Sequence, residues 1–205
     1  MSPSVRSPGT TTSRHSDVLA EHAPLLAHAT KHVGDPQVRH RGTIGGSLAH
    51  ADPASDLPAT TLALGATYVA AGPNGTREIA ARDFYESFMT SALAPDELLT
   101  EIRVPKMNGA KWNFQKFNRR ALDWAIVGVA AWRNGDSAGI GLVNMAGTPV
   151  LATAAADAHR LGCIARGRRR ARRRRVRPAG RPQRLGRIPS APRQGAHPAR
   201  LEAAA

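Results

Sequence analysis

Residues 39–59 read RHRGTIGGSLAHADPASDLPA, and the interpretation of the whole chain depends on this stretch. Gly45 and Gly46 leave backbone N–H groups without side-chain bulk, so an anion such as a pyrophosphate can approach the main chain. The hydroxyl groups of Thr43 and Ser47 can add donors. A tight turn uses the same glycines, and the stretch matches neither a G-x-G-x-x-G motif nor a P-loop. These residues alone therefore leave two interpretations open, a tight turn and a phosphate cradle.

The same stretch contains residue types that bind metals, namely His40, His50, Asp52 and Asp56. Pro53 and the expected turn give these side chains no regular spacing that would direct them at one centre, so we predict no metal site. The aspartates then cap turns and the histidines are solvated. Asp56 has a second possible role, as an acceptor for the ribose hydroxyls of a nucleotide.

The residues before this stretch have a helical pattern. Residues 16–34 read SDVLAEHAPLLAHATKHVG, with Ser16 as a possible cap, Pro24 in the first turn of a second segment and Gly34 at the end. Asp35-Pro36 is expected to force an extended stretch that leads into the glycine pair. Three histidines of this region are expected at the surface: His22, His28 and His32.

After the glycine pair the pattern changes to one helix followed by strands. Residues 58–66 predict a short buried helix that starts near Asp56. Residues 67–81 predict two strands joined at Asn74-Gly75. Further strands are expected at residues 97–105 and 111–118, and a hairpin that turns near Asn134-Gly135 is expected within residues 123–149. The sequence therefore predicts an α+β chain with mostly antiparallel pairing.

Three cations follow or end one of these strands: Lys116, Arg119 and Arg120. A solvated face is the default interpretation of such a cluster, and contact with an anion or a partner is the alternative.

The charge of the chain is concentrated at one end. The chain has 205 residues and a net charge of +14, but residues 1–157 hold 14 basic and 14 acidic residues, so the whole excess lies in residues 158–205. Residues 1–15 and the basic tail from 157 lack a hydrophobic period, and we predict both to be disordered. Many arginines suit the phosphates of nucleic acid, although the tail has no aromatic residue for base stacking. A small basic nucleic-acid-binding protein is therefore the alternative function.

Cys163 is the only cysteine, so the chain can form no internal disulfide and no iron-sulfur or zinc site built from its own thiolates. The N-terminus has no apolar run of signal-peptide length, and no stretch approaches the ~20 apolar residues of a membrane span. We expect a cytoplasmic protein. No candidate nucleophile has a recognisable elbow around it, so no catalytic residue is assigned.

Four stretches carry a family resemblance: residues 33–59, 89–105, 114–131 and 140–154. Together they resemble the FAD-binding medium subunit of the molybdenum hydroxylases, the family of xanthine dehydrogenase and aerobic carbon monoxide dehydrogenase. The resemblance runs in order from about Ser16 to about Ala156. It implies the second lobe of a two-lobed FAD-binding domain, similar to that of vanillyl-alcohol oxidase, over residues 16–106. The start of a small C-terminal domain with an antiparallel sheet is implied over residues 107–156.

The resemblance also implies a cofactor and a site. Electrons would pass from a molybdopterin site in a large subunit, through two 2Fe-2S clusters in a small subunit, to FAD in this chain and then to an acceptor. The implied FAD contacts are Thr43, Ile44, Gly45, Gly46 and Ser47 at the pyrophosphate, Asp56 at the nucleotide, and Leu99 and Lys116 near the flavin. The redox chemistry would belong to the cofactor, so a catalytic triad is not required.

The chain departs from the family at both ends. Family members carry an earlier loop of the type A-G-G-x-S/T-x-L, which is missing here, and an acidic helical segment where this chain has arginines. Reading residues 178–200 displaced by one nucleotide permits PADLNASAEYRRHLAKVLTRRAL, and reading residues 1–15 displaced by two permits VSIGALTRHHDVET; both resemble the family. We therefore hypothesise that residues 1–15 and 157–205 are out of frame, which sequencing codons 1 to 20 and 150 to 165 of the gene tests.

A frameshifted fragment would have consequences for the protein. We expect weak FAD binding or none, an uncovered apolar face on the sheet from about Lys111 to Met145, and poor solubility. A non-functional gene remnant is a further alternative.

Overall fold

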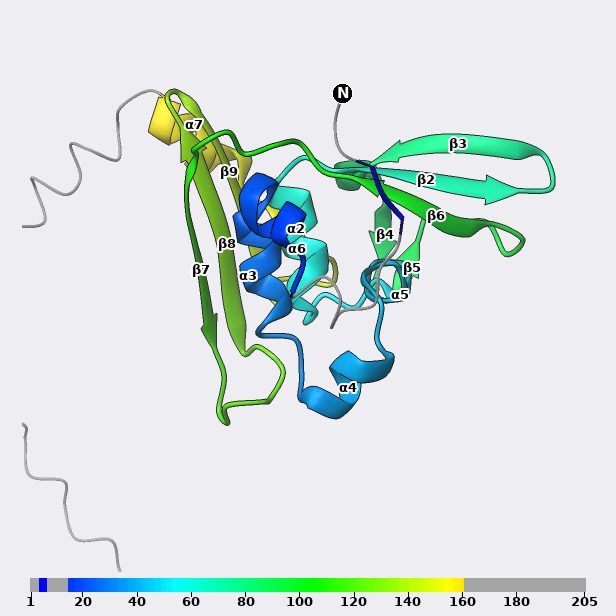
Figure 1. The fold of residues 1–205 in the computed structure, drawn as a ribbon, viewed down its shortest axis with the longest axis horizontal. Helices are drawn as coiled ribbons and strands as arrows, with labels where there is room; N and C mark the ends of the chain where they lie inside the picture. The colour runs from blue at the N-terminus through cyan, green and yellow to red at the C-terminus, as the bar shows by residue number, and fades with distance from the viewer. Residues whose placement is uncertain (1–3, 7–14, 161–205) are drawn as a thin grey trace, which may run out of the picture.

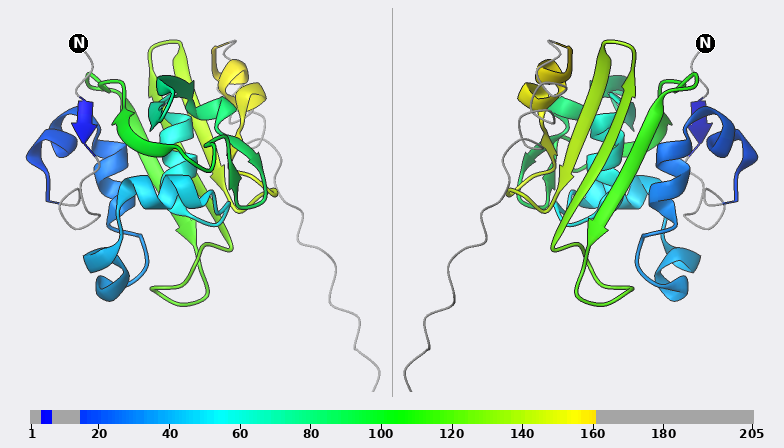
Figure 2. Two further views of the ribbon diagram at one scale, coloured as in Figure 1. Left: turned by 90° about the vertical axis from the view of Figure 1, so that its right-hand side faces the viewer. Right: turned by 90° about the vertical axis from the view of Figure 1, so that its left-hand side faces the viewer.

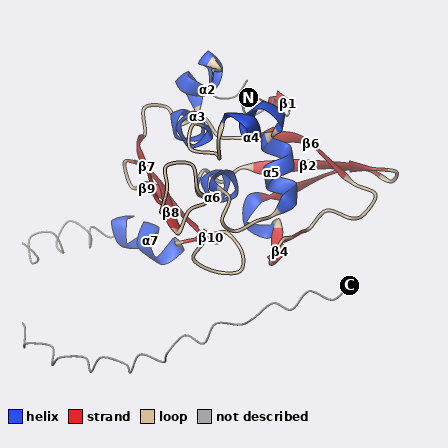
Figure 3. Cartoon of the chain, turned by 90° about the horizontal axis from the view of Figure 1, so that it is seen from below, coloured by secondary structure: helices blue, strands red, loops and turns tan. Residues whose placement is uncertain are grey.

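The computed structural model describes residues 4–6 and 15–160. Most of the helices lie between two four-stranded antiparallel sheets, as Figures 1 and 3 show from perpendicular directions, and a third sheet has two strands. The helices are α2 (Asp17–His22), α3 (Pro24–Thr30), α4 (Pro36–Arg41), α5 (Ile44–His50), α6 (Asp56–Ala63) and α7 (Thr153–Arg160). The strands are β1 (Ser4–Arg6), β2 (Thr67–Gly72), β3 (Gly75–Ala80), β4 (Tyr85–Ser87), β5 (Thr90–Ser91), β6 (Leu98–Arg103), β7 (Lys111–Phe117), β8 (Val127–Asn134), β9 (Ser137–Val143) and β10 (Val150–Leu151). The predicted α+β class is confirmed.

The first sheet has the strand order β1-β6-β2-β3. Gly72 pairs with Gly75, so Pro73 and Asn74 form the turn, and Gly75 adopts the positive φ of 114° that glycine tolerates. The predicted hairpin is therefore confirmed. The prediction of disorder for residues 1–15 is wrong for Ser4–Arg6, which pair with β6 in antiparallel register.

The second sheet has the strand order β10-β9-β8-β7, and its β8–β9 hairpin turns at Gly135 and Asp136, as predicted. Its inner face packs against α3 and α6. The right panel of Figure 2 looks onto the outer face, where the strands lie in front of the helices. Four apolar side chains share this outer face and are half-buried: Val129, Ala131, Ile140 and Leu142.

Strand β9 lies unusually close to helix α6. A Cβ atom at Gly141 would overlap the carbonyl oxygen of Ala59, and one at Gly139 would overlap that of Ala63. The indole Nε1 of Trp132 also donates to the Ala63 carbonyl, at 2.6 Å. Every residue of α6 is buried, so this helix forms the centre of the core, as the sequence predicts.

Side chains cap the starts of α2 and α4. The Leu19 N–H donates to Ser16 Oγ at 3.3 Å, which confirms the predicted cap of α2. The expectation of an extended stretch at Asp35-Pro36 is wrong. Asp35 itself is extended, but its Oδ1 accepts from the Val38 N–H at 2.8 Å, and Pro36 begins α4. Proline is compatible with the first helical position because its missing N–H would have no intrahelical partner there.

Helix α7 changes the predicted boundary of the tail. It runs to residue 160, so residues 157–160 are helical and not disordered. The remaining tail predictions, Cys163 included, fall on residues outside the described ranges. Within residues 4–6 and 15–160, no helix is long and apolar enough to cross a membrane.

Candidate functional site

A cleft of about 560 Å³ opens beside α5, between α4 and the loop that joins β7 to β8. Five of the eight predicted site residues line it: Thr43, Gly46, Ser47, Asp56 and Lys116. Ile44 and Gly45 are buried in the first turn of α5. Leu99 lies in β6, opposite Ala70, packs against the core and is not among the residues that line the cleft.

The glycine pair begins a helix instead of forming a tight turn. Thr43 caps α5, because its Oγ1 accepts from the Gly46 N–H at 2.9 Å. The Thr43 hydroxyl keeps its own proton for a further hydrogen bond. A Cβ atom at Gly46 would come within 2.9 Å of Thr43 Oγ1, so a side chain there would crowd this end of the helix. The cleft therefore meets a helix start without side-chain bulk, which is the geometry that favours an anion.

Asp56 and Lys116 meet at the back of the cleft although 60 positions separate them in the sequence. Lys116 Nζ donates to Asp56 Oδ2 at 2.8 Å, and the side chains are only 7% and 4% exposed. The expectation of a solvated Lys116 is therefore wrong. Lys116 Nζ also donates to the backbone carbonyl of His32 at 2.9 Å, which ties β7 to the end of α3.

Only one of the two carboxylate oxygens of Asp56 has a hydrogen-bond partner among the described residues. Its Oδ1 is buried and has no hydrogen-bond partner in the described part of the chain. Burial raises the pKa of Asp56 to about 6, because the desolvation of the charged form outweighs the hydrogen bond and charge of Lys116. At neutral pH Asp56 is therefore an ionised acceptor with one oxygen available to a ligand donor.

Sequence reasoning missed two further features of the cleft. The buried Arg39 donates through Nη1 to the carbonyls of Val33 and Gly34, at 2.8 Å each, and so holds a segment of the cleft wall. Two exposed apolar side chains, Leu122 (57%) and Trp124 (63%), line the opposite wall. In the sequence, the apolar residues Leu122, Trp124 and Ile126 occupy alternate positions between two strands. This spacing was the signal that could have indicated an apolar wall.

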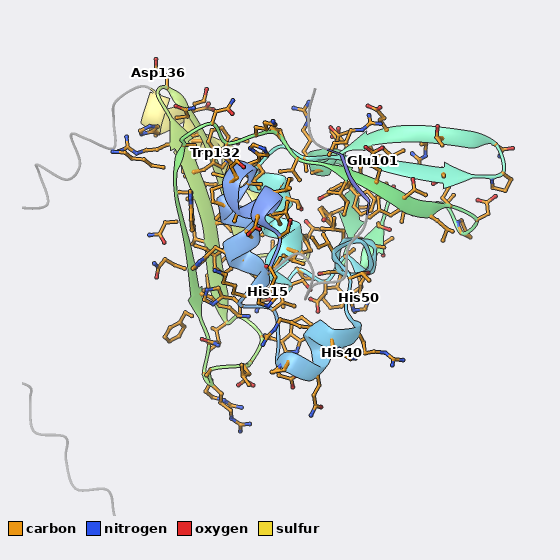
Figure 4. The ribbon with its side chains drawn as sticks, viewed as in Figure 1. His15, His40, His50, Glu101, Trp132 and Asp136 are labelled. Carbon is orange, nitrogen blue, oxygen red and sulfur yellow. The ribbon has the colours of Figure 1, made fainter. Side chains whose placement is uncertain are left out.

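The histidines near the glycine pair lie apart on two helices. Figure 4 shows His40 on α4 and His50 on α5, both below Trp132 and Asp136 in this view. His50 lines the cleft. Among the residues that the structure describes, no three histidine, cysteine, aspartate or glutamate side chains are grouped to hold a metal ion.

Comparison with known proteins identifies relatives of this chain. The sequence model of a family described as "FAD binding domain in molybdopterin dehydrogenase" matches residues 8–107, a match that begins inside the segment 1–15. The carbon monoxide dehydrogenase medium chain of Afipia carboxidovorans is 40% identical over 154 residues, which cover 70% of this chain and 54% of that one. The glyceraldehyde dehydrogenase medium chain of Sulfolobus acidocaldarius is 43% identical over 115 residues, which cover 56% and 41%.

Solved structures of two proteins also resemble this chain. The reconstituted CO dehydrogenase from Oligotropha carboxidovorans superposes with a TM-score of 0.69 at 39% identity, over 72% of this chain and 54% of that chain. Quinoline 2-oxidoreductase from Pseudomonas putida 86 superposes with a TM-score of 0.65 at 29% identity, over 73% and 57%. The chain thus spans about half the length of the relatives it matches.

Proposed function

The chain belongs, over residues 8–107, to the family of FAD-binding domains in molybdopterin dehydrogenases, and we propose that it is part of the electron-transfer subunit of a molybdenum hydroxylase. One observation carries the proposal. Residues that the family resemblance assigned to FAD from separate parts of the chain line one cleft, with Asp56 and Lys116 in contact. The division into a flavin lobe (16–106) and a C-terminal domain (107–156) remains part of the proposal.

The residues of the cleft fit FAD on three counts. The start of α5 is free of side-chain bulk at Gly46, the buried Asp56 Oδ1 lacks a donor, and Leu122 and Trp124 offer apolar surface to a ring. We propose that residues 43–47 hold the pyrophosphate and that Asp56 accepts from the nucleotide. Lys116 keeps Asp56 ionised and in place, and Leu99 stays a predicted contact.

Bound FAD would supply one- and two-electron redox chemistry, which no amino-acid side chain of the cleft provides. The protein residues bind, orient and shield. Thr43 fixes the first turn of α5, and Arg39 holds the wall at Val33 and Gly34. Trp124, which lines the other side, would shield a bound ring from water.

We further propose partners and a location. The relatives are named as medium chains, so a large molybdopterin subunit and a small subunit with 2Fe-2S clusters would complete the complex. With one cysteine and no internal disulfide, the chain suits the cytoplasm. The relatives reported above give the nucleic-acid alternative no support, and the arginine run lies outside the described residues.

The test is to titrate the purified full chain with FAD and to measure binding by flavin fluorescence and by calorimetry. Gly46→Ala places a methyl group against Thr43 Oγ1 at the start of α5, and we expect it to weaken FAD binding at least about tenfold. Gly147→Ala is the matched control, because nothing lies within 4 Å of the added methyl group. Equal FAD binding by the wild type and both variants would overturn the proposed role of residues 43–47. No binding at millimolar FAD would overturn FAD binding by the chain as given, and it is the result that the frameshift hypothesis allows.

A further inference from the structure

A pair of histidines lies at the end of α3, outside the residues that line the cleft. The helical turn continues past Thr30, since the His32 N–H donates to the carbonyl of Ala29 at 3.0 Å. His28 and His32 therefore sit one above the other at the i, i+4 spacing. Their Nε2 atoms are 3.1 Å apart and their ring centroids 4.9 Å apart.

This separation is the one that two imidazoles have on a single metal ion. Two nitrogens bound at about 2.0 to 2.1 Å lie about 2.9 Å apart at a right angle and about 3.3 Å apart at a tetrahedral angle. The observed 3.1 Å falls between these values. No helix rearrangement is then needed to bring both Nε2 atoms to one ion.

Aromatic side chains of β7 hold the two rings in place. The His28 ring lies 5.2 Å from that of Trp112, and the His32 ring lies 5.3 Å from that of Phe114. These contacts restrict the rotamers of both histidines before any ion arrives. A preorganised pair loses less conformational entropy on binding.

The charge state of the pair also suits a metal. Partial burial lowers the pKa of both histidines, and the charge of Lys31 acts in the same direction; His28 and Lys116 add to the effect at His32. The neutral form of both rings, which metal ligation requires, is therefore favoured. The two lysines also oppose a bound cation, although Asp56 offsets the charge of Lys116.

We propose that His28 and His32 form a two-histidine site for a late first-row divalent metal ion, of which Cu²⁺, Ni²⁺ and Zn²⁺ are the members that imidazole prefers. In the metal-free pair, one Nε2–H donates to the other Nε2. Binding moves that proton to Nδ1 of the same ring, so two ring protons remain and none is released at pH 7. The other coordination positions stay open to water, and the affinity is correspondingly modest.

The test is calorimetric titration of the full chain with Ni²⁺, together with electron paramagnetic resonance of the Cu²⁺ form. The chain has eight histidines, so a matched control is needed. His40→Ala removes an exposed histidine of α4 and leaves α3 intact. We expect wild type and His40→Ala to show a site with two nitrogen ligands, and His32→Ala to bind Ni²⁺ at least about tenfold more weakly.

His28→Gln provides a second variant, because glutamine removes the imidazole ligand with a side chain of similar length. Circular dichroism confirms that each variant is folded. Equal Ni²⁺ affinity in wild type, His28→Gln and His32→Ala would overturn the proposal, and so would the absence of a two-nitrogen Cu²⁺ signal in the wild type.

Discussion

Removing one member of the Asp56–Lys116 pair should destabilise the fold more than removing both. Lys116→Met leaves a carboxylate buried without its cation, and Asp56→Asn leaves a buried ammonium group. Each single change should cost about 3 to 5 kcal/mol of unfolding free energy. The double variant should recover a large part of that loss, as a denaturant-based double-mutant cycle would show. Strictly additive effects would contradict the coupling of these side chains.

The carboxyl group of Asp56 should also give the stability of the protein a defined pH dependence. Its pKa is about 6 in the folded chain against 3.8 ordinarily, so the folded state prefers the protonated form. The stability that this group contributes is therefore full below pH 4 and is lost as pH rises through about 6. Asp56→Asn should lack this slope. Denaturant midpoints of both proteins between pH 4 and 7 would measure the difference, and parallel profiles would refute it.

The site residues show where sequence reasoning stops. The TIGGS stretch alone left a tight turn and a phosphate cradle open, and only the family resemblance assigns it to FAD, which stays a prediction. The contact between Lys116 and Asp56 depends on how the second sheet packs on α6 through β8 and β9, and no spacing along the chain contains that information. Arg39 was missed for a similar reason, since an arginine in a polar stretch gives no sign that its guanidinium group is buried against backbone carbonyls.

At the scale of elements, β9 and α6 should not tolerate any side chain at their point of contact. Gly141→Ala places a methyl group on the carbonyl oxygen of Ala59, so strand and helix must separate. We expect a loss of at least about 3 kcal/mol or failure to fold, because overpacking against backbone has no rotamer to relieve it. Gly147→Ala should unfold at the wild-type temperature. Thermal unfolding measured by circular dichroism compares the two variants with the wild type. A Gly141→Ala protein as stable as the wild type would disprove the close approach of β9 and α6.

Most elements could be predicted because their signals are local. The Asn74-Gly75 and Asn134-Gly135 pairs mark turns, and Ser16 and Pro24 mark helix starts. The prediction at Asp35-Pro36 was wrong because proline restricts the preceding residue to extended backbone whether or not a helix follows. Whether a helix follows is decided by the Asp35 cap, which only the structure reveals.

At the scale of the whole molecule, the outer face of the second sheet should govern solubility. Val129→Thr together with Ile140→Thr makes this face more polar at nearly constant volume, and we expect less self-association with a change in unfolding free energy of at most about 1 kcal/mol. Val143→Thr on the fully buried inner face is the control, and it should destabilise the fold by about 1 to 3 kcal/mol. Sedimentation velocity and denaturant unfolding measure the two effects. Unchanged self-association in the double variant would contradict the role of this face.

The reading-frame hypothesis also belongs to this scale. Strand β1 lies at the edge of the first sheet, and the family match begins at residue 8, so part of segment 1–15 takes a place in the domain as written. For the tail the hypothesis keeps its original basis, which is the family-like sequence that residues 178–200 permit when they are read displaced by one nucleotide.

The close approach of β9 and α6 has a mechanical consequence. With no side chain between them, the strand and the helix cannot slide or tilt independently, so α6 and the second sheet move as one rigid body. Asp56 at the start of α6 and Lys116 on β7 both belong to that body, which favours a constant separation of the two side chains. The opposite wall of the cleft, built on the short α4 and α5, lacks such a lock. It is held instead by hydrogen bonds, since Nη1 of Arg39 on α4 donates to the backbone carbonyls of Val33 and Gly34.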